Sequence, residues 1–568
     1  MVAENIQRAP IDRSVVQFYL WAIGVLLLAM VWLGSAEFYT RGEPREAIVA
    51  QAMLETGNFV SPRVYGDRVP SKPPLFHWLA AAASVFTSGL NEFSVRLPSL
   101  LAAFVATLAI FIVVKREYGH ARALATVFML VTSIEWFRSA VVARVDMLLA
   151  CCLTLAFLAG FRWQQDRYRG IGWPVIIFSA LATLTKGPVG IALPCVVLAL
   201  WQLLHREPIL SIGKRLLIVA FLAVIPYLIW VVAGVVMNGD ALLSKLLYEN
   251  VARFTGTTED NPHSHSFVYL WLTLLVGFLP WTVAALAQWM QSTKWLWHPT
   301  QWWQRANPLE RYAALIVVVV VTFFSIPESK RSVYLLPAYP FISLLLAHSV
   351  LSIVDRVPAL LIVAARIAGF LSLAFGLFLA ATIVARLLPI DGFIQAHALS
   401  VHEVIGLEEC VILLVGLLLL VARRSYLQRF QPRHAMYALL GGLFLMGYAV
   451  GLPVTAAMLS ERDFASTLSA RVPQGSPIYS VDNEFYALNF YSRRGMATKE
   501  VDALAADDFV VLFLDKADAL QEPLATRALG YREIERSSRY VRDWGRVLSL
   551  GRIERISEDQ PESMRPLH

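Results

Sequence analysis

One loop decides how this chain is organised: EFYTRGEPREAIVAQAMLETGNFVSPRVYGDRVPSKPPLFHW, residues 37–78. It follows a single apolar segment and concentrates many charges. Apolar residues recur at helical spacing over residues 48–53, behind Glu43 and Pro44 at the start of the run. This pattern predicts an amphipathic helix that lies on a membrane surface and ends at Gly57.

The loop re-enters the apolar layer at Ser71-Lys72-Pro73-Pro74. The two prolines favour an extended backbone, which holds Lys72 at a defined depth. The alternative is an ordinary polar loop between two spans. Later loops on the same side repeat the pattern of isolated charges at membrane boundaries, which favours a functional loop.

The composition is that of a polytopic membrane protein. Of the 568 residues, 57% are hydrophobic and only 16% are charged, and the mean hydropathy is +0.57. Soluble domains carry far more charge for their apolar content. The net charge of +7 comes largely from Lys and Arg in short loops, where they set orientation, so it implies no nucleic-acid partner.

The positive-inside rule predicts about thirteen transmembrane helices, with Arg8 and Arg13 on the cytoplasmic side. The expected spans are 17–36, 97–114, 121–138, 147–163, 171–185, 189–204, 216–236, 267–290, 312–326, 333–354, 359–388, 404–422 and 435–458. The shorter apolar run 75–90 is expected to be re-entrant or interfacial, because only one span fits between the first loop and the basic cluster at 115–122.

The sequence divides into a transmembrane part, residues 1–459, with outer loops at 37–78 and 237–266, and a C-terminal domain, residues 460–568. In the second part charge rises and the hydrophobic runs shorten. Strand-like runs lie at 477–481, 509–514 and 547–550, and helix-like segments at about 483–491 and 517–529. This alternation predicts a small α/β domain outside the membrane, followed by a disordered tail.

The ionisable residues at the edges of the apolar spans all fall on one side of the membrane. They are Glu43, Arg45, Lys72, Arg144, Asp146, Lys186, Arg253, His263, His265, Glu328, Lys330 and Arg331, with Tyr334 among them. A charge inside hydrocarbon costs roughly a few kcal/mol, and chance snorkelling would scatter such charges over both faces. The grouping predicts one polar cavity that opens toward the outer leaflet.

The predicted cavity is mostly cationic, which suits the phosphate or pyrophosphate of a lipid. Glu43 and Asp146 are the first candidates for a general base or a metal ligand. This set fits glycosyl transfer from a lipid phosphate, because cations stabilise the leaving anion as the C1–O bond breaks. The acceptor hydroxyl needs a carboxylate to take its proton, unless the acceptor is already an anion such as a phosphate.

Each of these residues also has a structural alternative. Lys330 and Arg331 then snorkel to lipid head groups. Asp146 pairs with Arg144, and Glu43 caps its helix, where negative charge is favourable. The two loop histidines are then solvated and bind no metal.

In order along the chain, these residues resemble a known family. The matching segments are Glu43-Pro44-Arg45-Glu46-Ala47, residues 53–58, Lys72-Pro73-Pro74-Leu75, Asp146-Met147, Leu184-Thr185-Lys186-Gly187, residues 249–254, residues 278–281, and Ser329-Lys330 with Tyr334-Leu335-Leu336-Pro337. Together they resemble the bacterial aminoarabinose transferases, which move 4-amino-4-deoxyarabinose from undecaprenyl phosphate to lipid A. More broadly they resemble the GT-C glycosyltransferases with a protein-mannosyltransferase-like core.

The resemblance implies a GT-C fold with an exoplasmic C-terminal domain and a polyprenyl-phosphate sugar as donor. It implies that Lys72, Arg253 and Tyr334 hold the donor phosphate. Asp146 matches a carboxylate beside that phosphate, where a divalent metal ion can sit, and Glu43 and Arg45 belong to the acidic loop motif.

Two positions depart from the family pattern. Gly42 stands where the family has the Asp of its Asp-Glu pair, and Ser71 stands where it has the Glu before its Lys. The missing carboxylates lie near the reaction centre. The donor sugar and the acceptor therefore stay open, with aminoarabinose and lipid A as one possibility.

The sequence as a whole predicts a polyprenyl-phosphate-dependent hexosyl or pentosyl transferase of the bacterial inner membrane, facing the periplasm and inverting at C1. The enzyme is expected to lie among membrane lipids, to take its donor from the outer leaflet, and to transfer the sugar to a lipid or glycan. The expected phosphate ligands are Lys72 and Arg253, assisted by Lys186, Tyr334, Arg45 and Lys330, with Glu43 as base and Asp146 as metal or acceptor ligand.

Two alternatives remain. A transporter or flippase of lipid-linked sugars would show inverted repeats and charges reaching both leaflets. A non-catalytic assembly subunit would leave the one-sided charges without a use.

Overall fold

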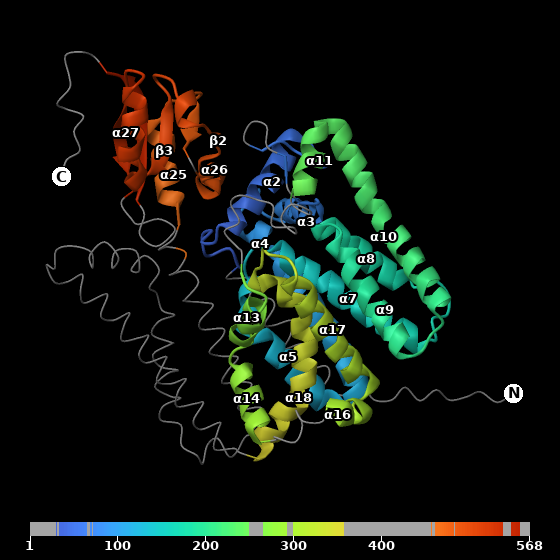
Figure 1. The fold of residues 1–568 in the computed structure, drawn as a ribbon. Helices are drawn as coiled ribbons and strands as arrows, with labels where there is room; N and C mark the ends of the chain where they lie inside the picture. Colours follow the sequence, from blue (N-terminus) through green and yellow to red (C-terminus); the bar gives the residue numbers. More distant parts are fainter. Residues whose placement is uncertain are drawn as a thin grey trace.

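A helical body carries a small α/β unit at one end (Figure 1). The computed structural model describes residues 33–64, 69–70, 72–248, 265–291, 299–356, 460–481, 483–537 and 547–556, with Met30 and Ala456. Within these ranges, five helical segments are long and apolar enough to cross a membrane. They are α4 (Glu92–Tyr118), α7 (Val145–Gln165), α10 (Ile209–Asn238), α17 (Pro308–Ser325) and Ser332–Ser352, which joins η3 (Ser332–Ala338) to α18 (Tyr339–Arg356).

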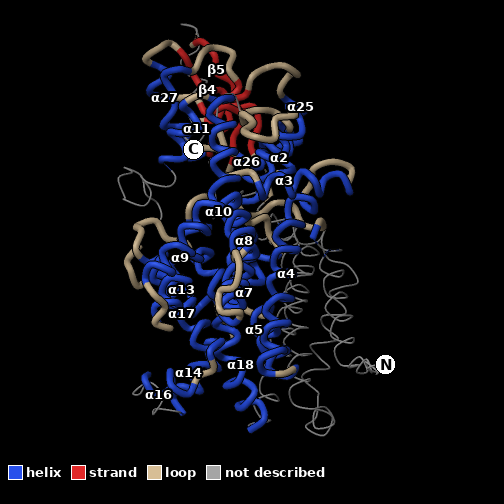
Figure 2. The backbone as a smooth tube through the Cα atoms, turned by 90° about the vertical axis from the view of Figure 1, so that its right-hand side faces the viewer, coloured by secondary structure: helices blue, strands red, loops and turns tan. Residues whose placement is uncertain are grey.

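Shorter helices complete the body (Figure 2). They are α5 (His120–Val131), α8 (Trp173–Lys186), α9 (Val189–Leu204), α11 (Asp240–Leu247), α13 (Tyr269–Gly277), α14 (Trp281–Gln291) and α16 (Pro299–Arg305). The polytopic helical fold is as predicted, while the total of thirteen spans stays a prediction. The expected spans 359–388, 404–422 and 435–458, and most of 17–36, lie outside the described residues.

The first loop folds as two short helices. The helix α2 (Gly42–Thr56) ends at Gly57, whose φ of 69° gives the left-handed cap that glycine adopts without strain. The helix α3 (Leu75–Ala83) continues through η1 (Ser84–Phe86) and is too short to cross a membrane, as predicted for this apolar run.

The expected span 121–138 is not one continuous helix, because α5 stops at Val131 and a separate helix, α6 (Ile134–Ala140), follows. The hydroxyl of Thr132 donates to the carbonyl of Phe128, and that of Ser133 donates to the carbonyl of Leu130. These side-chain bonds compete with the helical ladder and favour its end. Similarly, the expected span 267–290 is divided into α13 and α14 around Pro280.

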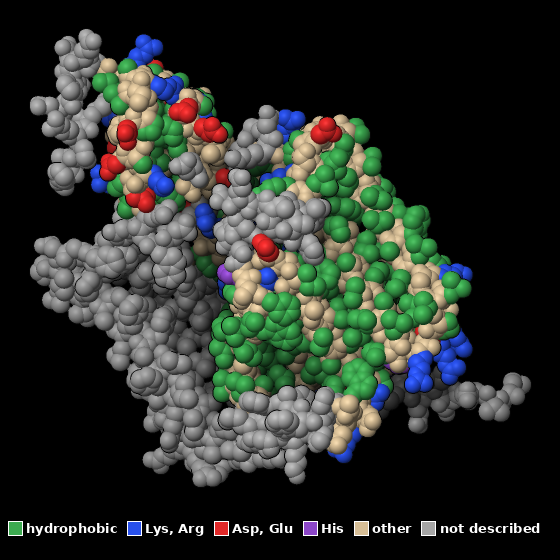
Figure 3. Space-filling model, viewed as in Figure 1, with side chains coloured by type: hydrophobic (Ala, Val, Ile, Leu, Met, Phe, Trp, Pro, Cys, Tyr) green, Lys and Arg blue, Asp and Glu red, His purple; other side chains and the backbone are tan. Residues whose placement is uncertain are grey.

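The helix α7 forms the centre of the body and packs against α4, α8, α9 and η3. By contrast, α10 exposes large apolar side chains such as Leu217, Phe221 and Val236. Figure 3 shows the resulting apolar surface on the helical body. A face of this kind is stable only against lipid or another apolar partner, in agreement with a membrane-embedded chain.

The α/β unit contains a five-stranded sheet in the order β2-β1-β3-β5-β4. Its strands are β1 (Ile478–Ser480), β2 (Met496–Thr498), β3 (Phe509–Phe513), β4 (Leu529–Arg536) and β5 (Leu548–Arg555), with α25 (Arg462–Arg471), α26 (Tyr486–Ser492) and α27 (Ala517–Ala525). The strand β1 pairs in parallel with β2 and β3, and β5 runs antiparallel to β3 and β4. The strands β1, β3 and β5 were predicted, whereas β2, β4 and α25 carry too little apolar periodicity to be found.

The α/β unit docks on the first loop through α26 (Figure 2). The phenol of Tyr491 donates to Glu92 Oε1 at 2.9 Å and accepts from the backbone N–H of Phe38 at 2.8 Å. Arg462 adds an ion pair with Glu37 at 3.5 Å, and the rings of Phe38 and Phe490 meet edge to face. The contacts therefore join the unit to the segment that precedes α2.

Candidate functional site

A cavity of about 1110 Å³ opens where the first loop, the start of α7, the end of α8 and the loop 327–334 meet. Residues Asn483, Glu484 and Tyr486 of the α/β unit form part of its wall. Its charged lining consists of Arg41, Arg45, Lys72, Arg138, Arg144, Lys186, Lys330, Arg331, Glu46, Asp146 and Glu484. Eight basic residues against three carboxylates make this a cavity for an anion.

Local sequence explains why the charges converge. The helix α8 ends at Lys186, because Gly187 and Pro188 interrupt the chain before α9. The helix α7 begins just after Arg144, so Asp146 lies in its first turn, where negative charge is favourable. Lys186 and Asp146 thus each lie in the terminal turn of a largely apolar helix.

Glu46 is the centre of the first group of contacts. Its carboxylate accepts from the ammonium of Lys72, from the guanidinium of Arg45 at 2.9 Å and from Nε2 of His77 at 2.9 Å. Glu46 is 4% exposed and His77 is 1% exposed. Glu46 was not among the predicted site residues, although it lies in the motif that suggested the family.

The charges of this group alter one another's protonation. Burial raises the pKa of Glu46, but Lys72, Arg45 and His77 together hold it well below its usual range. For Lys72, burial and the nearby Arg45 lower the pKa to about 8, against the opposing effect of Glu46 and Asp146. At neutral pH the group is therefore a carboxylate held between cations.

Lys186 forms the second group with Asp146 and Tyr334. Its ammonium donates to Asp146 and lies 3.9 Å from the centre of the Tyr334 ring. Tyr334 is itself packed against Phe324 at 5.3 Å between ring centres. The alternative pairing of Asp146 with Arg144 is thus wrong, because Lys186 reaches across from the end of α8 to take this carboxylate.

Lys330 does not point to a lipid surface. It is 4% exposed, and its ammonium donates to the carbonyl of His265 at 2.7 Å. The ring of His265 stacks on Tyr269 at 3.9 Å. The snorkelling alternative for this residue is therefore wrong, and Lys330 contributes its charge to the cavity wall.

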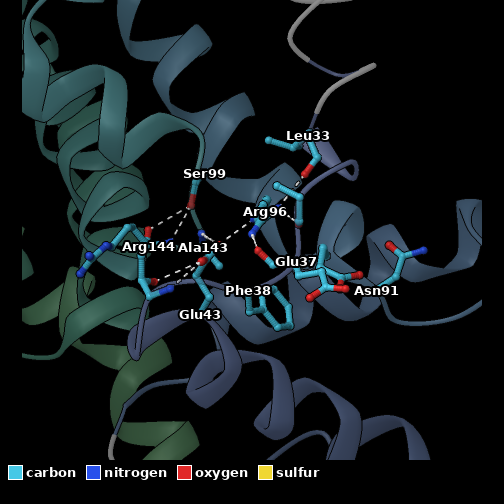
Figure 4. A network of polar contacts seen from close by, with 12 residues as sticks. Leu33, Glu37, Phe38, Glu43, Asn91, Arg96, Ser99, Ala143 and Arg144 are labelled. Carbon is cyan, nitrogen blue, oxygen red and sulfur yellow. Dashed lines mark hydrogen bonds and ion pairs between the residues drawn. The ribbon is translucent and has the colours of Figure 1, made fainter. Parts of the chain in front are cut away.

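Glu43 is not among the residues that line the cavity. Figure 4 shows it in a separate network of polar contacts with Arg96. One of its oxygens accepts from Nε of Arg96 at 2.6 Å, and the other accepts from the backbone and hydroxyl of Thr40. Both Glu43 and Arg96 are fully buried. This placement favours a structural role for Glu43, as the partner of Arg96 in a buried ion pair, over the catalytic role expected for it.

Six of the predicted site residues meet at the cavity: Arg45, Lys72, Asp146, Lys186, Lys330 and Tyr334. Arg253 lies outside the described residues, so its role as a phosphate ligand stays a prediction. Arg144 and Arg331, which were expected among the charges of the cavity, also line it, whereas sequence reasoning passed over Glu46, His77 and Arg138. Glu46 lies in the first-loop motif and Arg138 lies shortly before Arg144, so both were within reach of the same signal.

A divalent metal ion at Asp146, expected as a possibility, does not fit this donor set. The carboxylate of Asp146 already accepts from the ammonium of Lys186, and the other nearby carboxylate, Glu46, is held by two cations and a histidine. No three His, Cys, Asp or Glu side chains converge anywhere in the described ranges. Magnesium and calcium require several oxygen ligands, and here cations occupy the carboxylates.

Comparison with solved structures defines the class of fold. The chain matches ArnT from Cupriavidus metallidurans, solved bound to undecaprenyl phosphate, with a TM-score of 0.69 and 22% identity over 94% of this chain and 98% of that one. The same protein in its apo state gives a TM-score of 0.68. The chain therefore has the fold of a GT-C membrane glycosyltransferase.

Sequence comparison agrees with the resemblance that the motifs indicated. A family model described as dolichyl-phosphate-mannose-protein mannosyltransferase matches residues 71–230. The undecaprenyl phosphate-alpha-4-amino-4-deoxy-L-arabinose arabinosyl transferase of Shewanella sediminis is 29% identical over 58% of each chain. The corresponding protein of Pectobacterium carotovorum is 28% identical over 71% of this chain and 70% of its own.

These matches confirm that the chain is similar to the aminoarabinose transferases. The alignment to the Shewanella relative covers 58% of that protein's length, and the alignment to the relative from Pseudomonas paraeruginosa covers 62%.

Proposed function

We propose that this protein is a glycosyltransferase of the bacterial inner membrane. It takes a sugar from a polyprenyl phosphate, such as undecaprenyl phosphate, and transfers it to a lipid or glycan acceptor at the periplasmic face. Aminoarabinose as the sugar and lipid A as the acceptor are the reactants that its relatives' names and the motif resemblance suggest. The α/β unit then lies on the periplasmic side, beside the reaction.

The observation that carries this proposal is the pair of ammonium groups in the cavity, each held by a carboxylate. Lys72 is bound to Glu46, and Lys186 is bound to Asp146. A phosphate that enters between them exchanges these contacts for charge-assisted bonds of the same kind. The carboxylates keep both ammonium groups oriented before the ligand arrives, so little order has to be created on binding.

The same cations stabilise the charge that develops during transfer. When the acceptor oxygen attacks C1 of the sugar, the bond from C1 to the phosphate oxygen breaks and the polyprenyl phosphate gains negative charge. Lys72 and Lys186 lie on the cavity wall where they stabilise that charge. Attack on the face opposite the leaving phosphate inverts the configuration at C1.

Glu46 and Asp146, rather than Glu43, are the carboxylates placed to contact the acceptor. Burial opposes ionisation of Glu46, but its cationic neighbours keep its pKa low, which makes it a weak base. Glu46 is therefore suited to orienting Lys72 rather than to removing a proton from the acceptor. An acceptor that is already an anion suits this cavity, because it needs no base.

A transporter of lipid-linked sugars is the less favoured alternative. The first cavity and a second described cavity, whose charged lining is also mostly basic, share no lining residue, so nothing described in them links the two into a path for a transported head group. The second described cavity lies around Arg162 and His205 at the far ends of α7 and α9, and it is separate from the first.

The experiment is transfer from undecaprenyl phosphate-linked aminoarabinose to lipid A by the purified full chain in nanodiscs. Lys72→Ala removes a charge-assisted bond to the phosphate, and we expect kcat/KM to fall roughly ten- to hundredfold. Arg169→Gln is the control, because Arg169 is exposed beyond the other end of α7. Near-normal turnover by folded Lys72→Ala would exclude the phosphate role, and transport without product would favour the alternative.

A further inference from the structure

Arg144 is held by its backbone at the edge of the cavity. Its N–H donates to the hydroxyl of Ser99 at 2.8 Å, and that hydroxyl lies 3.3 Å from its carbonyl oxygen. Ser99 is fully buried on α4. In Figure 4 the side chain of Arg144 extends away from the pair formed by Glu43 and Arg96. The backbone of Arg144 is therefore held in place by Ser99, while its guanidinium points away from the Glu43–Arg96 pair.

The guanidinium of Arg144 is half-buried and makes no hydrogen bond or ion pair with another described residue. Its carboxylate neighbours are already engaged, Asp146 with Lys186 and Glu43 with Arg96. A partly buried guanidinium that faces the cavity without an ion-pair partner is favourably placed to bind an anion. The first turn of α7 adds positive potential at the same place.

Gly42 leaves room for such an anion. A Cβ atom at this position would lie 3.8 Å from Nη1 of Arg144. An aspartate there would place a carboxylate against the guanidinium and neutralise it. With glycine, the space between the first turn of α2 and Arg144 belongs to the cavity, and the guanidinium faces it.

We propose that Arg144 binds the anionic group of the acceptor, a phosphate or a carboxylate, and that Gly42 keeps this guanidinium available. The assignment rests on the proposed transferase function and deepens it. The donor phosphate has its own ligands at Lys72 and Lys186, whereas Arg144 faces Gly42 at the start of α2. The cavity then holds two anions, one from each substrate.

The reaction balances without a base. An anionic oxygen of the acceptor forms the new bond to C1, and the electron pair of the old C1–O bond stays with the polyprenyl phosphate. One negative charge passes from acceptor to leaving group, and no proton moves. Arg144 is a positioning residue in this scheme, because it orients the nucleophile and contacts neither C1 nor the leaving oxygen.

The test separates acceptor use from donor binding in the full chain. Arg144→Gln and Gly42→Asp should raise KM for lipid A roughly ten- to hundredfold, as expected for loss of a charge-assisted bond. The dissociation constant for undecaprenyl phosphate should stay within about twofold, because the donor ligands are left intact. Arg144→Lys should raise KM for lipid A less than Arg144→Gln does. Gly42→Asn is the uncharged control for Gly42→Asp.

Two further measurements complete the test, and the first of them depends neither on turnover nor on lipid A. Binding of inorganic phosphate to protein saturated with undecaprenyl phosphate should weaken in Arg144→Gln and in Gly42→Asp, but not in Gly42→Asn. The wild type should transfer sugar only slowly to dephosphorylated lipid A. The substitution Arg144→Gln should change this rate little.

Three results would overturn the assignment. Parallel losses of undecaprenyl phosphate binding and acceptor use would place Arg144 at the donor. Unchanged KM and unchanged binding of inorganic phosphate would leave it without a ligand, as would equal use of phosphorylated and dephosphorylated lipid A. If the wild type transfers no sugar, the proposed function fails instead, and the inorganic phosphate titration still decides whether Arg144 binds an anion.

Discussion

Lys72 shows how a single side chain combines binding and pH dependence. Its ammonium is bound to Glu46 at the cavity wall, in a position where burial and the charge of Arg45 make it easier to deprotonate than a free lysine. The pKa of about 8 lies close to physiological pH. The charge that the donor phosphate requires is therefore present at neutral pH and is lost in mildly alkaline solution.

The affinity for undecaprenyl phosphate should fall as pH rises through about 8, because Lys72 is charged below its pKa and neutral above it. Well above this pH the loss approaches about tenfold per pH unit. Lys72→Arg should bind with a flat profile to about pH 10, because a guanidinium remains charged there. Titrations of the dissociation constant against pH check this, and identical profiles for the two proteins would contradict it.

Transfer activity should survive removal of divalent metal ions, since Lys186 and Lys72 supply the positive charge beside Asp146 and Glu46. Dialysis against EDTA followed by the transfer assay measures this directly. A loss of activity that magnesium or manganese restores would show that a metal ion displaces Lys186 from Asp146.

At the scale of elements, the buried pair of Glu43 and Arg96 joins α2 to α4. Arg96 also donates to the carbonyls of Leu33, Ala36 and Glu37. The same guanidinium therefore provides hydrogen bonds for the backbone that precedes α2. The orientation of α2 follows from this contact. With Glu43 turned toward α4, Glu46 and Arg45 face the cavity.

Arg96→Ala should destabilise the protein by about 3–5 kcal/mol, because it leaves Glu43 as an uncompensated buried charge. Thermal unfolding in detergent, with Arg169→Gln as control, measures the change. Adding Glu43→Gln to Arg96→Ala should recover part of the loss, because the buried charge is then absent. A double variant no more stable than Arg96→Ala would contradict an electrostatic origin.

At the scale of the whole molecule, the α/β unit completes the cavity that the helical body begins. Asn483 and Glu484 reach the cavity wall, and a few residues later Tyr491 bonds to Glu92 and to the backbone of Phe38. Two parts of the chain therefore form the cavity together.

Tyr491→Phe should loosen the docking of the α/β unit, because the Phe38 N–H loses its acceptor at a cost of roughly 1–3 kcal/mol. Hydrogen exchange followed by mass spectrometry should show faster exchange in α26 and in residues 37–40. Tyr479→Phe is the matched control, since Tyr479 lies on β1 and not at this contact. Exchange equal to that of the wild type would show that the phenol does not hold the unit in place.

The amino-acid sequence by itself determined the apolar helices and the residues at their ends. Runs of hydrophobic residues and the positions of basic loops are local properties, so Lys72, Asp146 and Lys186 were placed on one side of the membrane from sequence alone. The family resemblance depended on the same local motifs. The short α3 and the strands β1, β3 and β5 were also found in this way.

Only the tertiary structure decided which charges are partners. Glu43 and Glu46 lie three residues apart on one helix, and their roles are set by Arg96 on α4 and Lys72 at the end of the loop. The choice of Lys186 over Arg144 for Asp146 depends likewise on how α8 packs beside α7. Periodicity in a sequence records which residues are apolar, whereas a pairing depends on distances that the packing of remote segments sets.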